Sequence, residues 1–186
     1  MLFGKESDET LVEKASSGNA AAWEKLIGRY ERKIYNHCLR LTGNREDALD
    51  LMQDVFLAVY RNLDKFRKEA SFSSWIYRIA SNRAIDTFRR KRGVHFFDDV
   101  DDNMADGKSG QSPSDCLFRS ETNRWIVKLL GRLPLEQRMV MELKFFQSLT
   151  FDEIAETMSI SSNTAKSRLY AAIRKLQADP EVIHAL

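Results

Sequence analysis

Along most of the chain, apolar residues recur at the three- and four-residue spacing that places them on one face of an α-helix. The clearest case is the segment 161–176, where a thin apolar stripe is formed by Ala165, Leu169, Ala172 and Leu176. The remainder of that segment carries amides, hydroxyls and cations. Strand-type alternation is absent, and the 186 residues include only 3 prolines and 8 glycines. The pattern therefore predicts an all-α protein.

The predicted helices are separated by short breaks except at one place. They are expected at about 8–17, 20–41, 45–63, 71–91, 122–134, 134–146, 150–158 and 161–176. Between 93 and 114 the sequence GVHFFDDVDDNMADGKSGQSPS has no apolar period and is rich in Asp, Gly, Ser and Pro. Such composition is typical of a flexible linker. We expect two small helical domains, 1–92 and 115–186, joined by the flexible acidic linker 93–114.

Charge is distributed unevenly along the chain, although the formal net charge is only +2. Segment 82–92 holds five cations and one aspartate, and segment 161–176 holds four cations and no acid. Between them, segment 98–106 holds five aspartates and no cation. The distribution of charge matters more than the net charge for recognising a nucleic-acid binder, so two basic segments separated by an acidic one are the pattern to be explained.

The last two predicted helices have the features of a helix-turn-helix. Thr150 and Glu153 form a Thr-x-x-Glu capping box, and Ser161 or Ser162 can cap the final helix a few residues after the previous one ends. Such a pair docks through a narrow stripe and lays its second helix in the DNA major groove. The polar face predicted to meet DNA carries Asn163, Lys166, Ser167, Tyr170 and Arg174. The alternative is a solvated surface helix of a small bundle.

The helix predicted at 71–91 combines aromatic rings with cations. Its apolar stripe runs through Phe72, Ile76 and Ala80, while Trp75 and Tyr77 fall outside it and an Arg/Lys cluster ends it. Rings that stack on bases, beside cations that follow phosphates, suit single-stranded nucleic acid or a base taken out of the duplex. The alternative places the rings in the core and the cations at a solvated helix end.

The helix predicted at 45–63 has the opposite character. Asp47, Asp50 and Asp54 share one face with Gln53 beside them, and two aromatics follow, Phe56 and Tyr60. An acidic surface with exposed rings suits a protein partner with a basic helix, whereas the simplest interpretation is a solvated acidic face.

Taken together, these motifs resemble a bacterial RNA polymerase sigma factor of the extracytoplasmic-function (ECF) type, in the sigma-70 family. DALDLMQDVFLAVYRNLDKF is similar to the segment of region 2 that binds the clamp helices of the largest polymerase subunit. FSSWIYRIASNRAIDTFRRKR is similar to the segment that reads and melts the −10 element. TFDEIAETMSISSNTAKSRLYAAIRKL is similar to the −35 helix-turn-helix of region 4.

The resemblance implies a role for each matching position. Asp50, Gln53, Asp54 and Phe56 would bind core polymerase, together with Tyr60 on the same helix. The −10 element would be contacted by Phe66, Tyr77 and Asn82 around a flipped base, with Arg83, Arg89 and Arg90 on the backbone. The −35 element would be contacted by Asn163, Thr164, Lys166, Ser167 and Arg168.

The resemblance also implies partners and a mechanism. The expected partners are core RNA polymerase, through its clamp helices and the flap of its second subunit, promoter DNA, and an anti-sigma factor. Two weak DNA-binding modules on one tether would together select a promoter. The acidic linker would enter the nucleic-acid channel of the polymerase.

No catalytic or metal-binding motif is found in the sequence, so we expect neither enzymatic activity nor a cofactor. Segment 99–110 lacks the glycine and glutamate of an EF-hand, and the His and Cys residues lack zinc-ligand spacing. Two isolated cysteines, no signal peptide and no bilayer-length apolar run indicate a cytoplasmic protein. The competing functions are a dimeric helix-turn-helix regulator that binds duplex DNA alone and a metal-dependent nuclease using Asp47, Asp50 and Asp54.

Overall fold

The computed structural model describes residues 6–68, 70–91 and 121–179. Within these ranges the chain is helical and contains no strand, as predicted. The α-helices are α1 (Asp8–Ser16), α2 (Ala20–Thr42), α3 (Arg45–Arg61), α4 (Phe72–Lys91), α6 (Glu121–Gly131), α7 (Leu135–Phe145), α8 (Phe151–Met158) and α9 (Ser162–Gln177), with a short 3-10 helix, η1 (Leu63–Lys65), after α3. The predicted linker 93–114 lies outside the described residues.

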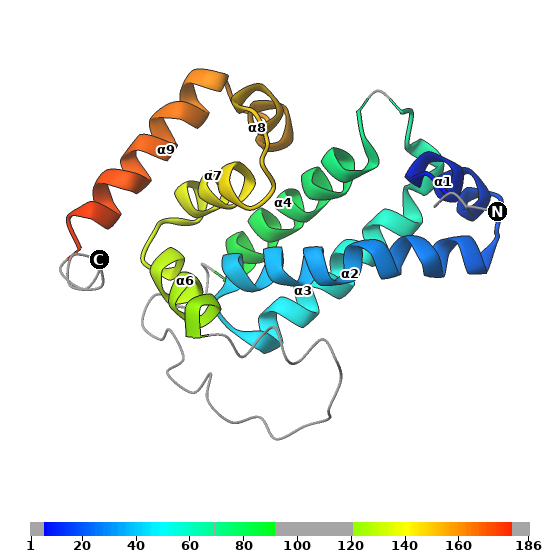
Figure 1. The fold of residues 1–186 in the computed structure, drawn as a ribbon, viewed down its shortest axis with the longest axis horizontal. Coiled ribbons are helices and arrows are strands. Elements are labelled where there is room, and N and C mark those ends of the chain that lie inside the picture. The colour runs from blue at the N-terminus through cyan, green and yellow to red at the C-terminus, as the bar shows by residue number, and fades with distance from the viewer. Residues whose placement is uncertain (1–5, 69, 92–120, 180–186) are drawn as a thin grey trace, which may run out of the picture.

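The first module is a bundle in which α3 packs on α2, and α4 packs on α3 and α2 (Figure 1). Its core contains fully buried side chains from every helix, including Leu11 of α1, Ile34 of α2, Val55 of α3 and Ile76 of α4. Burial of such side chains supplies most of the free energy that holds helices together.

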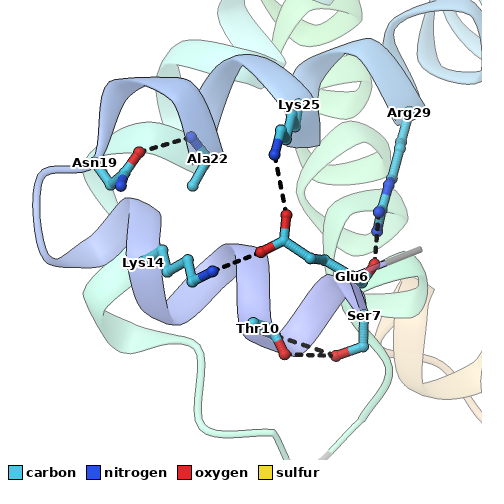
Figure 2. A network of polar contacts seen from close by, with 8 residues as sticks. All are labelled: Glu6, Ser7, Thr10, Lys14, Asn19, Ala22, Lys25 and Arg29. Atoms are coloured by element: carbon cyan, nitrogen blue, oxygen red, sulfur yellow. Dashed lines mark hydrogen bonds and ion pairs between the residues drawn. The ribbon is translucent and has the colours of Figure 1, made fainter. Parts of the chain in front are cut away.

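The first helix is fastened to α2 by a polar network (Figure 2). The Glu6 carboxylate accepts hydrogen bonds from Lys14 Nζ, at 2.5 Å, and Lys25 Nζ, at 3.1 Å. Arg29 donates to the Glu6 carbonyl and to Asp8 Oδ1, the latter at 2.7 Å. The two lysine pairs are exposed and add little stability by themselves. They link Glu6, just before α1, to both α1 and α2.

The helix ends follow local sequence signals. Gly43 ends α2 in the left-handed conformation, at φ 84°, and Asn44 caps α3 by accepting from the Asp47 backbone N–H at 2.8 Å. The predicted capping box is present, because Thr150 and Glu153 exchange hydrogen bonds at the start of α8. Of the two candidates for the α9 cap, Ser161 is the residue used.

The second module contains α6 to α9, with α9 along its outer edge (Figure 1). Helix α9 packs on α7 and α8 through the predicted stripe, in which Ala165, Leu169, Ala172 and Leu176 are all buried. The turn between α8 and α9 passes through Ser159, which adopts a left-handed backbone at φ 53°.

The two modules are packed against each other. The prediction of two small domains joined by a flexible linker did not include this contact. Helices α6 and α7 lie on α2, and α8 lies on α4. One buried cluster continues from the first module into the second, from Leu11 through Tyr77 to Met139 and Leu169. The outer face of α9 nevertheless stays exposed, so this packing does not bury the predicted DNA-reading helix.

Candidate nucleic-acid interface

A polar cleft of about 430 Å³ opens along α4, where it faces the end of α3 and η1. Two of the predicted −10 residues, Asn82 and Arg83, line it and are exposed. The sequence analysis did not assign to this site the further polar lining residues Asn62, Lys65, Arg78 and Asp86. The cleft therefore combines cations for a phosphate backbone with amides that can hydrogen-bond a base edge.

The aromatic part of this cleft is Trp75, which a cluster of rings holds in place. The Trp75 ring centroid lies 5.3 Å from that of Phe66 and 5.7 Å from that of Phe72. Phe72 is buried, while Trp75 and Phe66 are half-buried. Phe66 therefore supports the indole that lines the cleft, and a base could stack on the remaining surface of that indole.

Tyr77 differs from the expectation, because its side chain is 2% exposed and does not lie on the open face of α4. Its ring packs edge-on against His37 of α2, with the centroids 5.3 Å apart. Burial raises the pKa of the Tyr77 phenol, and the nearby Glu142 carboxylate raises it further. Tyr77 is therefore a core residue in this conformation, and we correct its assignment as an accessible base-stacking ring.

Cations continue along α4 beyond the cleft. Arg89 and Arg90 are exposed, as a backbone-binding role requires. Arg90 Nη2 lies 4.0 Å from Asp54 Oδ2 of α3, so the basic end of α4 meets the acidic face of α3. The side chain of Lys91 and all of Arg92 lie outside the described residues.

The predicted polymerase-binding face lies on α3. Asp50, Gln53 and Asp54 are exposed, and Tyr60 is 59% exposed, whereas Phe56 is half-buried and packs against the core. Leu57 extends the same face and is 46% exposed.

This face also has an aromatic border that the sequence analysis missed. The Tyr60 ring centroid lies 5.2 Å from that of Trp23 of α2. Leu57 could have been found because it follows Gln53 at i+4, but an isolated leucine in a helix is usually assigned to the core. Trp23 could not have been found from the sequence, because only the packing of α2 on α3 brings its ring beside Tyr60.

The predicted −35 face lies along α9. Asn163, Lys166, Ser167, Tyr170 and Arg174 are exposed, and the tyrosine is 60% exposed. Thr164 is half-buried, with its hydroxyl 2.8 Å from that of Ser161 in the helix cap. This face offers an amide, hydroxyls and cations within three helical turns, a set suited to base edges and phosphates.

Arg168 is held by a partner that the sequence analysis did not identify. Its Nη2 lies 2.7 Å from Glu136 Oε2 at the start of α7, and its side chain is 24% exposed. The ion pair orients the guanidinium beside the exposed face of α9. Only the packing of α7 on α9 brings these two residues together.

The described parts of the chain contain no group of three or more His, Cys, Asp or Glu side chains placed to hold a metal ion. In those parts, no helix is both long and apolar enough to cross a membrane.

Comparison with known families gives two matches that follow the two modules. Residues 26–94 match the model of sigma-70 region 2, and residues 123–176 match that of sigma-70 region 4.

Curated relatives match over almost their full length. The chain is 31% identical to the ECF RNA polymerase sigma factor SigW of Bacillus subtilis, over 90% of this chain and 95% of that protein. It is 30% identical to the ECF RNA polymerase sigma-E factor of Escherichia coli K12, over 89% of this chain and 90% of that protein.

Two solved structures share the fold. CnrH in complex with the cytosolic domain of CnrY superposes with a TM-score of 0.66 and 23% identity, covering 93% of this chain and 96% of CnrH. The sigma factor RpoE of Bartonella quintana, in complex with the anti-sigma factor NepR, superposes with a TM-score of 0.67 and 19% identity, covering 87% of this chain and 96% of RpoE.

Proposed function

The chain belongs to the sigma-70 family as a factor of the ECF type, and from that premise we propose how its residues carry out the function of the family. The protein binds core RNA polymerase and directs promoter-specific initiation of transcription. The family consists of initiation factors without catalytic activity of their own. We propose a cytoplasmic localisation, because RNA polymerase acts in the cytoplasm. The proposed domain bounds are 1–92 and 115–186, with a linker at 93–114.

The cleft along α4 supports a role in reading the −10 element. A base removed from the duplex could stack on Trp75 and hydrogen-bond to Asn82. Arg78 and Arg83 could then contact the neighbouring phosphates of the same strand. Stacking of one base on an aromatic ring contributes about 1–3 kcal/mol. That amount is comparable to the free-energy cost of unstacking the base. Stacking on Trp75 would therefore offset this cost and stabilise the melted strand.

The exposed face of α9 supports a role in reading the −35 element in duplex DNA. Asn163 and Lys166 lie in its first turns, the part of a recognition helix that reaches base edges. Arg174 follows two turns later and would contact a phosphate. Arg168, positioned by Glu136, would contact the backbone beside them.

The exposed face of α3 supports a role in binding the polymerase clamp helices. Its acids Asp50 and Asp54 would attract a basic helical surface, while Leu57 and Tyr60 supply the apolar contact that charges alone lack. We also propose a contact of the second module with the flap of the polymerase and control by an anti-sigma factor. The sigma factor RpoE of B. quintana, which shares the fold, was solved with such a partner.

The function is tested by transcription in vitro. Purified protein, bacterial core polymerase and fragmented genomic DNA of the source organism are combined, and the transcripts are sequenced. We expect start sites that share a −10 and a −35 sequence. Start sites identical to those made by core polymerase alone would contradict the proposal.

Single substitutions in the same assay test the two DNA-reading faces. Asn82→Ala is expected to reduce promoter opening about 5- to 160-fold, because a lost bidentate-type base contact costs about 1–3 kcal/mol. Lys166→Ala is expected to weaken −35 binding and lower the slope of log affinity against log salt by about one. Lys128→Ala is the matched control, since its side chain is exposed on α6, a helix that carries neither of these faces. Parental activity in both test variants would overturn the residue assignments.

A further inference from the structure

The contact between the two modules is built around a buried carboxylate. Glu142 of α7 is 0% exposed. Its Oε1 accepts from Arg40 Nη2 of α2 at 2.9 Å and lies 3.2 Å from His37 Nδ1, while Arg40 Nε donates to Oε2. Within its own module and among the described residues, the Glu142 carboxylate accepts a hydrogen bond only from Gln147 Nε2, at 2.9 Å. Most partners of this carboxylate therefore belong to the other module.

A second charged group crosses the contact in the opposite direction. Arg138 of α7 donates through Nη1 to the Leu41 carbonyl at the end of α2, and through Nη2 to Gly131 O and Leu133 O in its own module. The Arg40 guanidinium also lies over the Phe146 ring, 4.1 Å from its centroid. Buried charges are tolerated only when they are paired and hydrogen-bonded, so these contacts define one docked arrangement.

The docked second module also lies along part of the α4 face proposed to read the −10 element, because α8 packs on α4. A second cleft, of about 270 Å³, lies between the start of α4 and α8. Arg78 and Trp75 line this cleft as well as the larger one along α4. The opposite wall carries Glu153 and Glu156 of α8. Docking therefore places two carboxylates beside a cation and a ring that would otherwise be open to a DNA strand.

We propose that the Glu142–Arg40–His37 contact is an intramolecular lock that holds the free protein in a closed form, in which α8 masks the Arg78–Trp75 wall from single-stranded DNA. The inference rests on the proposed role of α4 in binding DNA. Undocking returns Glu142 and Arg40 to water and removes the α8 carboxylates from Arg78. The apparent DNA affinity of the free chain is then its intrinsic affinity multiplied by the fraction of open molecules.

Two substitutions on opposite sides of the contact test the lock in the full chain. Glu142→Gln and Arg40→Gln each remove one charge of the buried Glu142–Arg40 ion pair, so each is expected to raise the radius of gyration measured by small-angle X-ray scattering. The double variant is expected to expand no more than either single variant, because all three disrupt the same contact. Circular dichroism establishes that helix content is retained, and Glu24→Gln, an exposed carboxylate of α2, is the control.

The masking is tested by fluorescence anisotropy with a fluorescein-labelled, random-sequence single-stranded 20-mer as probe. We expect Glu142→Gln to bind it about tenfold more tightly than the parent if about a tenth of the parent is open. Glu156→Gln changes an exposed position, so its fold is not at risk; we expect it to bind about twofold more tightly without expansion. Arg78→Ala in the Glu142→Gln background is expected to reverse the gain.

The outcomes separate the lock from the function on which it rests. An unchanged radius in both single variants with retained helix content overturns the lock. Expansion without tighter binding overturns the masking by α8. If Arg78→Ala fails to reverse a gain in binding, the masked wall is not the DNA site, and the inference falls while promoter-specific transcription can still stand. If transcription fails but Arg78-dependent binding and expansion are observed, the lock stands and the proposed function does not.

Discussion

At the scale of single residues, Tyr77 shows how the environment overrides position on a helix. The buried stripe of α4 was predicted from Phe72, Ile76 and Ala80, and all three are buried. Tyr77 and Ser81, spaced at i+4, form a second buried row that the pattern of apolar residues did not contain. That row is covered because α2 and the second module both pack near α4, as the His37 ring and the Glu142 carboxylate near Tyr77 show. A serine and a tyrosine carry no apolar signal strong enough to predict this.

The burial of Tyr77 predicts two different results for two substitutions. Tyr77→Ala removes a buried ring and is expected to lower the free energy of unfolding by about 3–5 kcal/mol. Tyr77→Phe is expected to change it by less than about 1 kcal/mol, because the hydroxyl has no hydrogen-bond partner among the described residues. Urea unfolding followed by circular dichroism measures both. A small loss in Tyr77→Ala would indicate an exposed ring and restore its original assignment.

At the scale of helices, boundaries follow capping signals that are local in sequence. Asn44, Thr150 and Ser161 each accept a backbone hydrogen bond at the start of a helix, and each was identified as a cap candidate from its residue type and position. The end of α3 was less predictable: the helix stops at Arg61 and continues as η1. The apolar period persists through Leu63, which is buried, so the pattern alone does not report the change of helix type.

The turn between α8 and α9 contains a position where glycine is expected to be more stable than the native residue. Ser159 sits at φ 53°, and a left-handed backbone costs a residue with a Cβ about 1–2 kcal/mol. Ser159→Gly is therefore expected to raise the free energy of unfolding by about 0.5–1 kcal/mol. This net gain is smaller than the relieved strain, because glycine also increases the conformational entropy of the unfolded chain. Ser161→Ala, two residues later, removes the α9 cap and is expected to lower it by about 1 kcal/mol. Thermal unfolding distinguishes the two, and equal effects of the same sign would contradict this account.

At the scale of the whole molecule, the contact between modules depends on groups that are far apart in the chain. His37 and Arg40 lie near the C-terminal end of α2 in the first module, and Glu142 lies about a hundred positions later in the chain. Each looked unremarkable in the sequence: a histidine, an arginine and a glutamate within helices of mixed charge. Their mutual burial converts them into the polar centre of an interface.

This interface predicts that docking weakens in acid. Burial raises the pKa of Glu142, but hydrogen bonds from His37 and Arg40 outweigh this effect and hold that pKa below the usual range of a glutamate. A carboxyl whose pKa is lowered by docking stabilises the docked form above its undocked pKa, and this contribution is lost as pH falls through the docked value. We expect the radius of gyration to rise as pH falls below about 4.5, the range in which a free glutamate is protonated. Glu142→Gln is the control, since it lacks the titrating group and should show a smaller dependence on pH.

What the amino-acid sequence determined by itself was everything that depends on neighbours within a few turns: helix type, most helix ends, the narrow stripe of α9 and the exposed cations and amides of its other face. Those features repeat at short spacing, so apolar period and cap chemistry are sufficient to predict them. Contacts between distant segments decided the rest, including the cleft shared by α3, η1 and α4, the pairing of Arg168 with Glu136, and the burial of Tyr77 and Glu142. Such contacts follow from the way whole helices fit together, and no local pattern of residues encodes that fit.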